Sequence, residues 1–439
     1  MKGVIICGGK GTRMGDDAPP KSLLIIGGKP LIQHHIEWFV KHGITDIIVL
    51  AGDKSKPIKA FLDSYPTPAN IVFQVESFPL GTAGALKSAE PFLDCPFIVI
   101  YGDKMHDVRL DRMIEYHYSK PSVCTIAVHP TTHMHDSDLL DMDENGRIVA
   151  VYPKPHDPSQ DYRNLTNICI YIMDPVCFRH ITNGVFSDFA RDVLPKLIVS
   201  ERVYGYLTLE YMRDIGTPER LKEVNRDWAF GNIINFATQL PAIFLDRDGV
   251  IVKRKDGKLG DGNDIRTPDE LELYPDAAAS IKTINKSKYL AIIITNQPGI
   301  AKGLLTMDDL SRINKRIETL LGKEGAELDA IFTCPHHPEI GWPGENPLYK
   351  IDCDCRKPGP GLILQAAEQF NIDLSRSYMI GDTWRDIGAG RSAGTKTVAL
   401  LRGDNDWKEG DKSDYVFDSL IDAICYILRK EGENAIPVR

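Results

Sequence analysis

Short apolar runs alternate with amphipathic segments along the first half of the chain. The runs at 47–50 and 97–100 are rich in β-branched residues, as expected of buried strands, whereas 32–40 and 218–228 carry apolar residues at helical spacing. A regular exchange of strands and helices is typical of an α/β fold. The first half therefore predicts a Rossmann-like domain with a mixed, mostly parallel sheet.

A second series of the same kind begins after Pro241, a residue that favours an extended entry into a strand. The preceding segment, 230–240, is the predicted linker. Helical segments separate the apolar runs of this series, which occur at 242–245, 292–294, 378–380 and 397–400. The pattern predicts a second, doubly wound α/β domain, so that the two domains span 1–231 and 241–430.

Length and composition agree with this division. A chain of 439 residues exceeds what one hydrophobic core usually serves, and no apolar run approaches the ~20 residues that span a bilayer. We expect no membrane partner.

The start of the chain shows no export signal, so the cytoplasm is the expected location. A net charge of −9 argues against nucleic acid as a partner, because binding to phosphate backbones needs a concentrated basic surface.

Charged and hydroxyl-bearing residues follow several predicted strands of the second domain. Asp246 and Asp248 stand two residues apart, where a strand would point both side chains to one face. The ends of neighbouring parallel strands form the ligand crevice of a doubly wound sheet. Similar positions are held by Thr295 and Asn296, by Arg356 and Lys357 before a helix, and by Asp382, with Asp386 one helical turn later. Singly, such residues are most often turn or cap residues, but together they indicate one site.

These motifs, in this order, resemble those of the haloacid dehalogenase (HAD) superfamily of phosphatases over residues 241–428. The resemblance implies that Asp246 attacks phosphorus, while Asp248 protonates the leaving oxygen and later deprotonates water. It also implies a Mg²⁺ ion bound by Asp246, Asp248 and Asp382, which neutralises charge during the attack. The residues that it assigns to the phosphoryl oxygens are Thr295, Asn296 and Lys357.

Three cysteines and a histidine form the other organised feature of this half. Cys334 and His336 are followed, after a loop rich in Pro and Gly, by Cys353 and Cys355. Three thiolates and one imidazole suit closed tetrahedral zinc, so we predict a structural Zn²⁺. A disulfide is the alternative, but a reducing compartment and the strain of a Cys-x-Cys bridge disfavour it. His337 is the alternative ligand to His336.

This loop ends at Arg356, and with it the sequence resembles one branch of the superfamily, that of D-glycero-D-manno-heptose-1,7-bisphosphate 7-phosphatases and histidinol-phosphate phosphatases. The runs at 246–250, 295–303 and 353–358 are most similar to the heptose enzymes. The resemblance implies that Arg356 contacts the substrate. Thr383 departs from the pattern, because the heptose phosphatases commonly carry Lys after the Gly-Asp pair. The sugar and its anomer therefore stay open.

Glycines and cations follow the first predicted strand of the chain. The loop contains Gly8, Gly9, Gly11, Thr12 and Arg13, and Lys21 follows it. Glycines let backbone N–H groups approach a phosphate closely, and the cations balance its charge. The loop matches neither a dinucleotide fingerprint nor a P-loop. Further motifs are a glycine-rich helix start with Gly81, Thr82 and Gly84, and two acids after strands, Asp103 and Asp214.

Together these motifs resemble the sugar-phosphate nucleotidylyltransferases over residues 1–228, and most closely the mannose-1-phosphate and heptose-1-phosphate guanylyltransferases. The resemblance implies that a sugar 1-phosphate attacks the α-phosphorus of a nucleoside triphosphate, while Arg13 and Lys21 stabilise the developing charge. Asp103 and Asp214 would bind Mg²⁺. The remaining positions that it implies are Lys154 and Asn167 for the acceptor, and Gly8, Gly9, Gly11, Thr12, Gly81, Thr82 and Gly84 for the nucleotide.

The two resemblances connect, because a sugar bisphosphate that loses its distal phosphate becomes a sugar 1-phosphate. We therefore expect a bifunctional enzyme of nucleotide-activated heptose synthesis. Its expected substrates are heptose 1,7-bisphosphate, heptose 1-phosphate and GTP or another nucleoside triphosphate. Hydrolysis of histidinol phosphate is one alternative, and a non-catalytic sugar-nucleotide sensor in the first domain is another. A homo-oligomer stays open, since neither half shows a heptad pattern.

Overall fold

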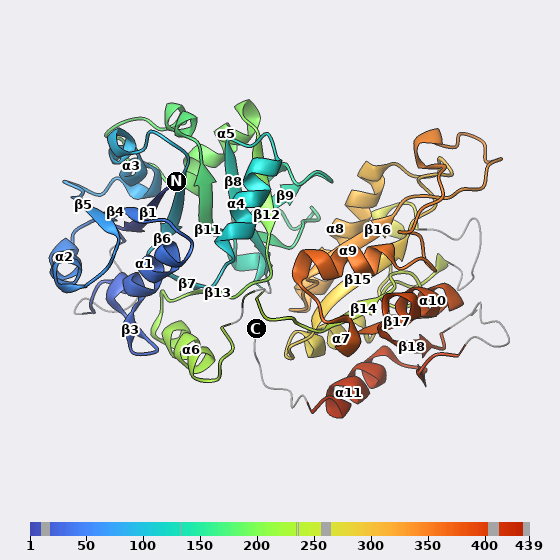
Figure 1. The fold of residues 1–439 in the computed structure, drawn as a ribbon. Helices are drawn as coiled ribbons and strands as arrows, with labels where there is room; N and C mark the ends of the chain where they lie inside the picture. The colour runs from blue at the N-terminus through green and yellow to red at the C-terminus, as the bar shows by residue number, and fades with distance from the viewer. Residues whose placement is uncertain are drawn as a thin grey trace. The chain divides into compact units, whose positions relative to one another are not determined.

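The chain alternates between strands and helices in both halves (Figure 1). The computed structural model describes residues 1–9, 18–131, 133–233, 235, 237–255, 265–402 and 412–432. Its contacts divide into two compact units, the first of Met1–His129, Asp138–Lys154 and Leu165–Ala237, and the second of Pro130–Ser137, Pro155–Asn164 and Thr238–Arg439. The predicted boundaries at 231 and 241 remain a proposal.

The first unit is built on a nine-stranded mixed sheet. Its elements are β1 (Lys2–Cys7), β2 (Ile25–Ile26), β3 (Lys29–Pro30), α1 (Leu31–Lys41), β4 (Asp46–Ala51), α2 (Ser55–Ser64), β5 (Asn70–Val75), α3 (Gly81–Ser88), β6 (Phe97–Tyr101), β7 (Lys104–His106), α4 (Leu110–Ser119), β8 (Cys124–Pro130), β9 (Leu139–Met142), β10 (Ile148–Tyr152), β11 (Leu165–Met173), α5 (Leu194–Ser200), β12 (Val203–Leu207), β13 (Met212–Asp214) and α6 (Pro218–Ala229).

Strand β1 lies at the centre of the parallel part of this sheet, between β4 and β6. Successive residues of β1 point to opposite faces, so Val4 and Ile6 pack in the core that includes α3 and α5, whereas Ile5 packs in the core that includes α1, α2 and α4. Both faces of the strand are buried, which explains its continuous apolar run. Strand β11 runs antiparallel to β6 and makes the sheet mixed, as predicted.

The second unit is built on a six-stranded sheet in which every pair of neighbours is parallel. Its strands lie in the order β16-β15-β14-β17-β18-β19, which is the doubly wound order that reverses at the first strand. The elements are β14 (Ala242–Leu245), α7 (Ala277–Ile284), β15 (Leu290–Asn296), α8 (Met307–Lys323), β16 (Ala330–Cys334), α9 (Gly361–Phe370), β17 (Tyr378–Gly381), α10 (Trp384–Ala393), β18 (Lys396–Leu400), β19 (Tyr415–Phe417) and α11 (Leu420–Lys430).

Apolar side chains from α7, α8 and α11 cover one face of this sheet. On α8 the buried residues Leu310, Ile313, Ile317 and Leu321 recur every three or four positions, which is the spacing of a single helix face. Helices α9 and α10 cover the other face (Figure 1). The predicted two-domain α/β fold is confirmed.

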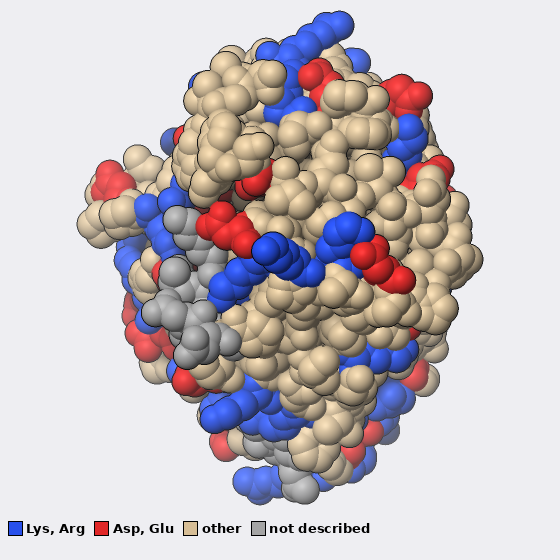
Figure 2. Space-filling model, turned by 90° about the vertical axis from the view of Figure 1, so that its left-hand side faces the viewer, with Lys and Arg blue, Asp and Glu red and all other residues tan. Residues whose placement is uncertain are grey.

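None of the helices in the described part of the chain is long and apolar enough to cross a membrane. On the face of the molecule drawn in Figure 2, Lys and Arg side chains alternate with Asp and Glu, and uncharged residues form most of the surface.

A pair of buried histidines lies beside the strand that follows β6. His35 of α1 and His106 of β7 stack with ring centroids 5.4 Å apart, and both are at most 5% exposed. His35 Nε2 forms a hydrogen bond of 2.8 Å with the carbonyl oxygen of Lys104, so the imidazole holds the backbone next to Asp103. Burial lowers the pKa of His35 to about 4, and that of His106 lies well below its ordinary value for the same reason.

These pKa shifts predict that acid destabilises the first unit. Below pH ~6.5 these histidines are protonated in the unfolded chain but stay neutral in the folded protein. The free energy of unfolding therefore decreases as the pH falls from about 6.5 toward the pKa of the folded protein. In His35→Gln the amide can still donate to Lys104 but does not titrate. Between pH 7 and pH 5 the variant should lose about 2 kcal/mol less free energy of unfolding than the unmodified protein, measured by urea denaturation. The exposed His133→Gln should behave as the unmodified protein, and an equal pH dependence in His35→Gln would contradict the assignment.

Candidate active sites

In the second unit the polar residues gather at the carboxyl ends of β14, β15 and β17, next to the point where the strand order reverses. Asp246 directly follows β14, and its backbone N–H donates to the carbonyl oxygen of Ile380 on β17 at 3.0 Å. Thr295 is the next-to-last residue of β15, and Asp382 directly follows β17. All three side chains are at most 10% exposed. The sheet itself therefore brings together residues that are far apart in the sequence.

Asp246 is buried beside a lysine. The Nζ of Lys357 lies 2.8 Å from Asp246 Oδ1, and this oxygen also accepts the backbone N–H of Arg247 at 2.7 Å. Burial and the nearby carboxylate of Asp386 raise the pKa of Asp246 to about 6, although Lys357 acts in the opposite sense. The site thus holds more negative charge than its cations balance.

Asp382 and Asp386 supply that extra charge. One carboxylate oxygen from each lies within 4.8 Å of the others and of Asp246, a set that can hold a metal ion. Burial raises the pKa of Asp382 to about 7 although the Arg254 guanidinium, 2.8 Å away, lowers it. Gly249 permits this approach, because a Cβ there would lie 2.0 Å from Asp382 Oδ2 and its φ is +95°. Oxygen donors and a shortage of positive charge are what a hard divalent cation requires.

Asp248 is oriented by two side chains that the sequence did not indicate. Gln297 Nε2 donates to Asp248 Oδ2 at 2.8 Å and to the hydroxyl oxygen of Thr295 at 2.9 Å. Arg247 Nε donates to both oxygens of Asp248 at 3.1 Å, and its side chain is only 1% exposed. Gln297 thereby joins Asp248 to Thr295, and Arg247 fixes the carboxylate of Asp248.

Asn296 and Thr383 act on the site through other residues. Asn296 exchanges two hydrogen bonds of 3.0 Å with the backbone of Lys357, donating to its carbonyl oxygen and accepting its N–H. Thr383 caps α10 in a capping box with Asp386, whose other oxygen lies 2.6 Å from Lys357 Nζ. Asn296 thus fixes the backbone of Lys357, and Asp386 fixes its ammonium group.

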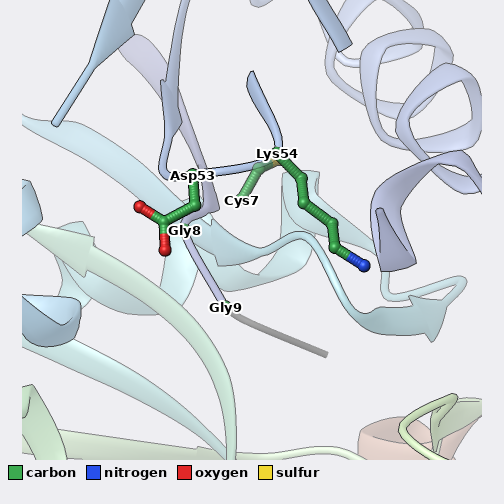
Figure 3. A pocket seen from close by; sticks show the side chains of 5 residues that line it. All are labelled: Cys7, Gly8, Gly9, Asp53 and Lys54. Carbon is green, nitrogen blue, oxygen red and sulfur yellow. The ribbon is translucent and has the colours of Figure 1, made fainter. Parts of the chain in front are cut away.

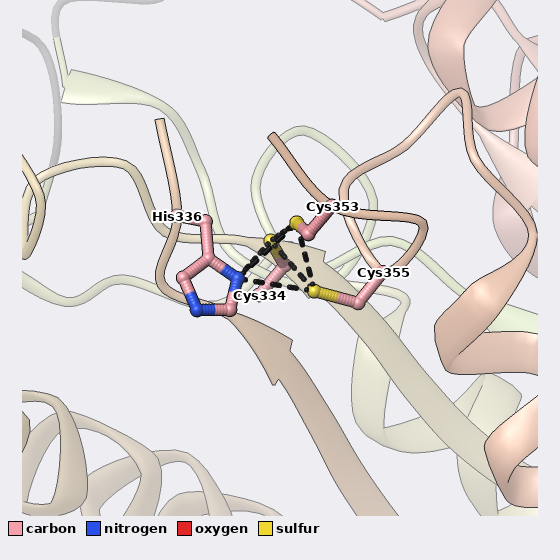
Figure 4. Close-up of side chains that lie close together, drawn as sticks. All are labelled: Cys334, His336, Cys353 and Cys355. Carbon is pink, nitrogen blue, oxygen red and sulfur yellow. Dashed lines mark hydrogen bonds between the residues drawn. The ribbon is translucent and has the colours of Figure 1, made fainter. Parts of the chain in front are cut away.

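The four predicted zinc ligands converge as Figure 4 shows. The Sγ atoms of Cys334, Cys353 and Cys355 are 3.1 to 3.7 Å apart, and His336 Nδ1 lies 3.2 to 3.7 Å from each of them. Four ligand atoms at similar mutual distances form a tetrahedron that can hold a metal ion. His337 is not part of this set. Its ring instead meets Trp342 at a centroid distance of 5.0 Å.

In the first unit two acids meet two lysines at the ends of β7 and β13. Lys21 Nζ lies 2.9 Å from Asp103 Oδ2, and Lys104 Nζ lies 2.7 Å from Asp214 Oδ2. Lys104 and Asp214 are partners in the antiparallel β7–β13 pair. Against the effect of burial, Lys104 and the N–H of Gly216 hold the pKa of Asp214 below its usual range. A Cβ on Gly216 would lie 2.7 Å from Asp214 Oδ1 and 3.4 Å from Lys21 Nζ, so the predicted Lys21, Asp103 and Asp214 do form one cluster.

A small pocket opens after β1 (Figure 3). It has a volume of about 160 Å³ and is lined by Cys7, Gly8, Gly9, Asp53 and Lys54, with Asp53 and Lys54 pointing in opposite directions. Beyond the lining, Glu76 approaches from the end of β5: a Cβ on Gly8 would lie 3.4 Å from Glu76 Oε2. Burial and the charge of Asp53 raise the pKa of this carboxyl, although the backbone N–H of Leu80 lowers it.

Other predicted nucleotide residues are engaged by the protein itself. A Cβ on Gly81 would lie 2.4 Å from the carbonyl oxygen of Ser187, and one on Gly84 would lie 2.9 Å from that of Val185. Thr82 Oγ1 donates to Asp188 at 2.9 Å. Packing against this segment accounts for all three residue types, so their contact with a nucleotide stays a prediction.

The side chains at the remaining predicted positions are less buried. Lys154 is exposed, with its backbone N–H donating to Asp138 at 3.0 Å. Asn167 is half-buried, donating to the Tyr171 hydroxyl at 2.7 Å. Gly11, Thr12 and Arg13 lie outside the described residues.

The residues that the sequence did not indicate share one property. The roles of Arg247, Arg254, Gln297 and Glu76 depend on what they face in the fold. Arg247 and Gln297 lie in runs that the sequence analysis quoted, but their residue types alone did not assign them a contact. The nearest signal was the position of Gln297 directly after Thr295 and Asn296.

Both sites combine acids with paired cations at the ends of strands, and the acids are buried in the second unit and partly exposed in the first. This is the arrangement of enzymes that transfer phosphoryl or nucleotidyl groups. A family model described as nucleotidyl transferase matches residues 2–229, and one described as HAD-hydrolase-like matches residues 354–423.

The relatives and the solved structure that follow each cover part of the chain. The D-glycero-beta-D-manno-heptose-1,7-bisphosphate 7-phosphatase of Rhodopseudomonas palustris is 39% identical over 158 residues, which are 36% of this chain and 82% of that protein. The enzyme of the same name from Vibrio cholerae is 37% identical over 191 residues, which are 43% of this chain and 97% of that protein. The structure of HddC from Yersinia pseudotuberculosis complexed with GMP-PN is 26% identical, covers 52% of this chain and 99% of its own, and has a TM-score of 0.45.

The chain is therefore an enzyme that joins a nucleotidyl transferase domain to a HAD-like phosphatase domain. It belongs to the nucleotidyl transferase family through its first half and to the heptose-1,7-bisphosphate 7-phosphatase family through its second. Both predicted resemblances are confirmed.

Proposed function

We propose that this enzyme removes the C7 phosphate of D-glycero-D-manno-heptose 1,7-bisphosphate and then transfers a nucleotidyl group, GMP from GTP, to the heptose 1-phosphate that results. The observation that carries the proposal is the buried contact of Asp246 with Lys357, with Asp248 oriented beside it. The names of the relatives that match the second half support the sugar. Both steps would take place in the cytoplasm.

In the phosphatase step, a carboxylate oxygen of Asp246 attacks the C7 phosphorus and the bond from phosphorus to the C7 oxygen breaks. Asp248 gives its proton to that leaving oxygen, and later takes a proton from the water that attacks the aspartyl phosphate. Inorganic phosphate leaves and Asp246 is regenerated. Lys357 Nζ is 2.8 Å from Asp246 Oδ1 and is therefore placed to contact an oxygen of the phosphoryl group, next to the hydroxyl of Thr295.

The donor set at this edge suits Mg²⁺. Asp246 and Asp382 carry buried carboxylates whose pKa values are raised first by burial and then by neighbouring carboxylates, and Asp248 is one of the charges that act on Asp246. When bound, the ion would neutralise charge between the phosphate and the carboxylate nucleophile. The guanidinium of Arg254, which lies 2.8 Å from Asp382, would move away from this carboxylate when the ion binds.

In the transferase step, an oxygen of the sugar 1-phosphate attacks the α-phosphorus of the triphosphate and pyrophosphate leaves. Lys21 lies in the cluster with Asp103 and Asp214, where it can stabilise the developing charge, and the two acids would bind the Mg²⁺ that accompanies the triphosphate. Arg13 is assigned the same task as Lys21. The 1-phosphate that the first step leaves untouched is the nucleophile of the second.

Glu76 favours GTP as the donor. Guanine presents two neighbouring donors, N1–H and N2–H₂, which a carboxylate can accept together, whereas adenine presents an acceptor at N1. The carboxylate of Glu76 lies next to Gly8, which lines the small pocket after β1. A base that lay against the glycine backbone of this pocket could meet that carboxylate. A half-buried carboxylate there would select against adenine by leaving its own oxygens unpaired.

The decisive experiment is product analysis with heptose 1,7-bisphosphate and each nucleoside triphosphate. We expect phosphate release, then pyrophosphate release and a GDP-linked heptose. Asp246→Asn should lower phosphatase activity by roughly 10³-fold or more while leaving transfer from supplied heptose 1-phosphate intact, and Asp103→Asn should do the reverse. The exposed Asp308→Asn is the control.

Each alternative gives a different result in this experiment. A clear preference for histidinol phosphate would overturn the assigned sugar. Absence of pyrophosphate release with every triphosphate would support a sensor in place of a transferase. Loss of both activities from either single change would contradict two independent sites.

For the base, we expect Glu76→Gln to lower kcat/KM for GTP by roughly 10- to 100-fold, because a charge-assisted pair of hydrogen bonds is replaced by a neutral amide. The ratio of kcat/KM for GTP over ATP should fall with it, measured by pyrophosphate release. The exposed Glu90→Gln provides a matched control. An unchanged ratio in Glu76→Gln would show that another group reads the base.

We also propose that the Cys334, His336, Cys353 and Cys355 set binds one structural Zn²⁺. Tetrahedral zinc places sulfur ligands about 3.8 Å apart and a sulfur and a nitrogen about 3.6 Å apart, close to the distances of 3.1 to 3.7 Å found among these atoms. All four positions are filled by the protein, which is the pattern of a structural site rather than a catalytic one.

The purified protein should therefore contain about one zinc ion per chain. Cys353→Ser should lose it, and the second unit should melt at a temperature lower by roughly 5 to 10 °C, because zinc binding stabilises only the folded state. Cys425→Ser on α11 should keep both the metal and the melting temperature. Full zinc content in Cys353→Ser, measured by elemental analysis, would contradict the assigned ligands.

A further inference from the structure

The second unit contains two short segments from the first half of the sequence. The first segment is Pro130–Ser137 and the second segment is Pro155–Asn164. The backbone N–H of Thr131 donates to the side-chain oxygen of Asn164 at 3.0 Å, and Asn164 is only 1% exposed. The two segments are therefore joined to each other within this unit.

Helix α8 holds the second segment on a face of its own. Thr319 lies about 200° farther round the helix than Ile317, which packs on the sheet, so its side chain points away from that core. Yet Thr319 is buried. Its Oγ1 accepts the backbone N–H of Tyr162 at 2.8 Å and donates to the carbonyl oxygen of Tyr162 at 3.3 Å. A surface helix ordinarily buries one face, so the second segment accounts for the burial of this other one.

Two neighbours of Thr319 on α8 extend this contact. A Cβ on Gly322 would lie 2.2 Å from Sδ of Met134 in the first segment, so only a residue without a side chain fits there. Oε2 of Glu318 lies 2.8 Å from Nε of Arg163 in the second segment, and the glutamate side chain is only 4% exposed. A buried carboxylate needs such a partner. The surface of α8 is thus matched to both segments.

The segments lead directly into the positions that the sequence assigns to the acceptor. Lys154 immediately precedes the second segment, and Asn167 follows it on β11. Asp138 comes directly after the first segment. Its Oδ1 accepts the backbone N–H of Lys154 at 3.0 Å, and its carbonyl oxygen accepts the hydroxyl of Thr166 at 3.1 Å. A movement of the segments on α8 would therefore move the backbone at both acceptor positions.

We propose that α8 takes part in the transferase reaction by placing the residues that bind the acceptor, a sugar 1-phosphate. Thr319 and Glu318 are positioning residues, which act through the two segments on Lys154 and Asn167. This inference rests on the proposed transferase function and adds to it a dependence on a helix of the second unit. The predicted nucleotide residues follow β1 and begin α3, far from both segments in the sequence, so a change on α8 acts on the acceptor and leaves GTP binding unaltered.

The first test removes the hydroxyl that holds Tyr162. Thr319→Val keeps the shape of the side chain, and we expect it to raise the KM for heptose 1-phosphate by roughly 3- to 10-fold, measured by pyrophosphate release. The KM for GTP and the phosphatase kcat/KM should stay unchanged. Thr319→Ser keeps the hydroxyl and should restore most of the KM. A loss of folded protein would instead lower the kcat of both reactions and leave each KM as it was.

The second test exchanges a partly exposed ion pair at the edge of the same contact. Nη1 of Arg316 on α8 lies 3.2 Å from Oδ1 of Asp161 in the second segment. Arg316→Asp places like charges together and should raise the same KM, and adding Asp161→Arg should lower it again by restoring a pair of opposite charges. Arg312→Asp, on the same helix at a position that is 57% exposed, is the matched control and should change neither activity.

An unchanged KM for heptose 1-phosphate in both Thr319→Val and Arg316→Asp would overturn the inference. An equal rise in the KM for GTP, or no recovery on adding Asp161→Arg, would overturn it as well. Absence of transfer in the unmodified protein would instead contradict the proposed function, and the inference with it. Phosphatase activity, measured in every variant, shows that the second unit is folded.

Discussion

Lys357 Nζ lies between two buried carboxylates, 2.8 Å from Asp246 and 2.6 Å from Asp386, and the second unit depends on this arrangement. A buried charge is tolerated only when it is paired and hydrogen-bonded, and removing one partner typically costs about 3–5 kcal/mol. The same contacts join three parts of the fold. Lys357 is fixed by Asn296 at the end of β15, Asp246 follows β14, and Asp386 is held in the first turn of α10 by Thr383. Stability and the geometry of Asp246, the proposed nucleophile, therefore rest on the same ion pairs.

The first unit also pairs acids with lysines, but these side chains are less buried than those of the second unit. Asp103 and Asp214 each face a lysine, but their side chains are 29% and 26% exposed, so water shares in balancing the charge. A nucleoside triphosphate carries several negative charges into its site, and lysines that are already placed beside carboxylates can turn toward it. The phosphatase receives a smaller phosphoryl group and surrounds it with buried residues. Under the proposed functions, the difference in burial agrees with the size of the group that each site would admit.

Sequence reasoning located the strand-end acids because an apolar run followed by an acid is a local pattern. Asp246, Asp382 and the four zinc-type ligands all belong to short motifs, and the fold brings each set together as expected. Arg254 could not be found in this way, since it is 128 residues from its partner Asp382 and belongs to no motif. For the glycines, packing offers a second explanation, and their contact with a nucleotide stays a prediction. Gly81 resembles a nucleotide-binding residue, yet the carbonyl oxygen of Ser187 alone excludes a side chain there. A motif thus identifies which residues are special, and only the packing shows what each of them faces.

The chemistry of the two proposed reactions also bears on how they fit together. Hydrolysis at C7 breaks the bond between phosphorus and the C7 oxygen and leaves the 1-phosphate of the sugar intact. That phosphate is the nucleophile which the proposed transferase step needs, whereas a sugar that had lost it could not react in the second site. Each turnover of the proposed phosphatase therefore supplies the transferase with a substrate that can react.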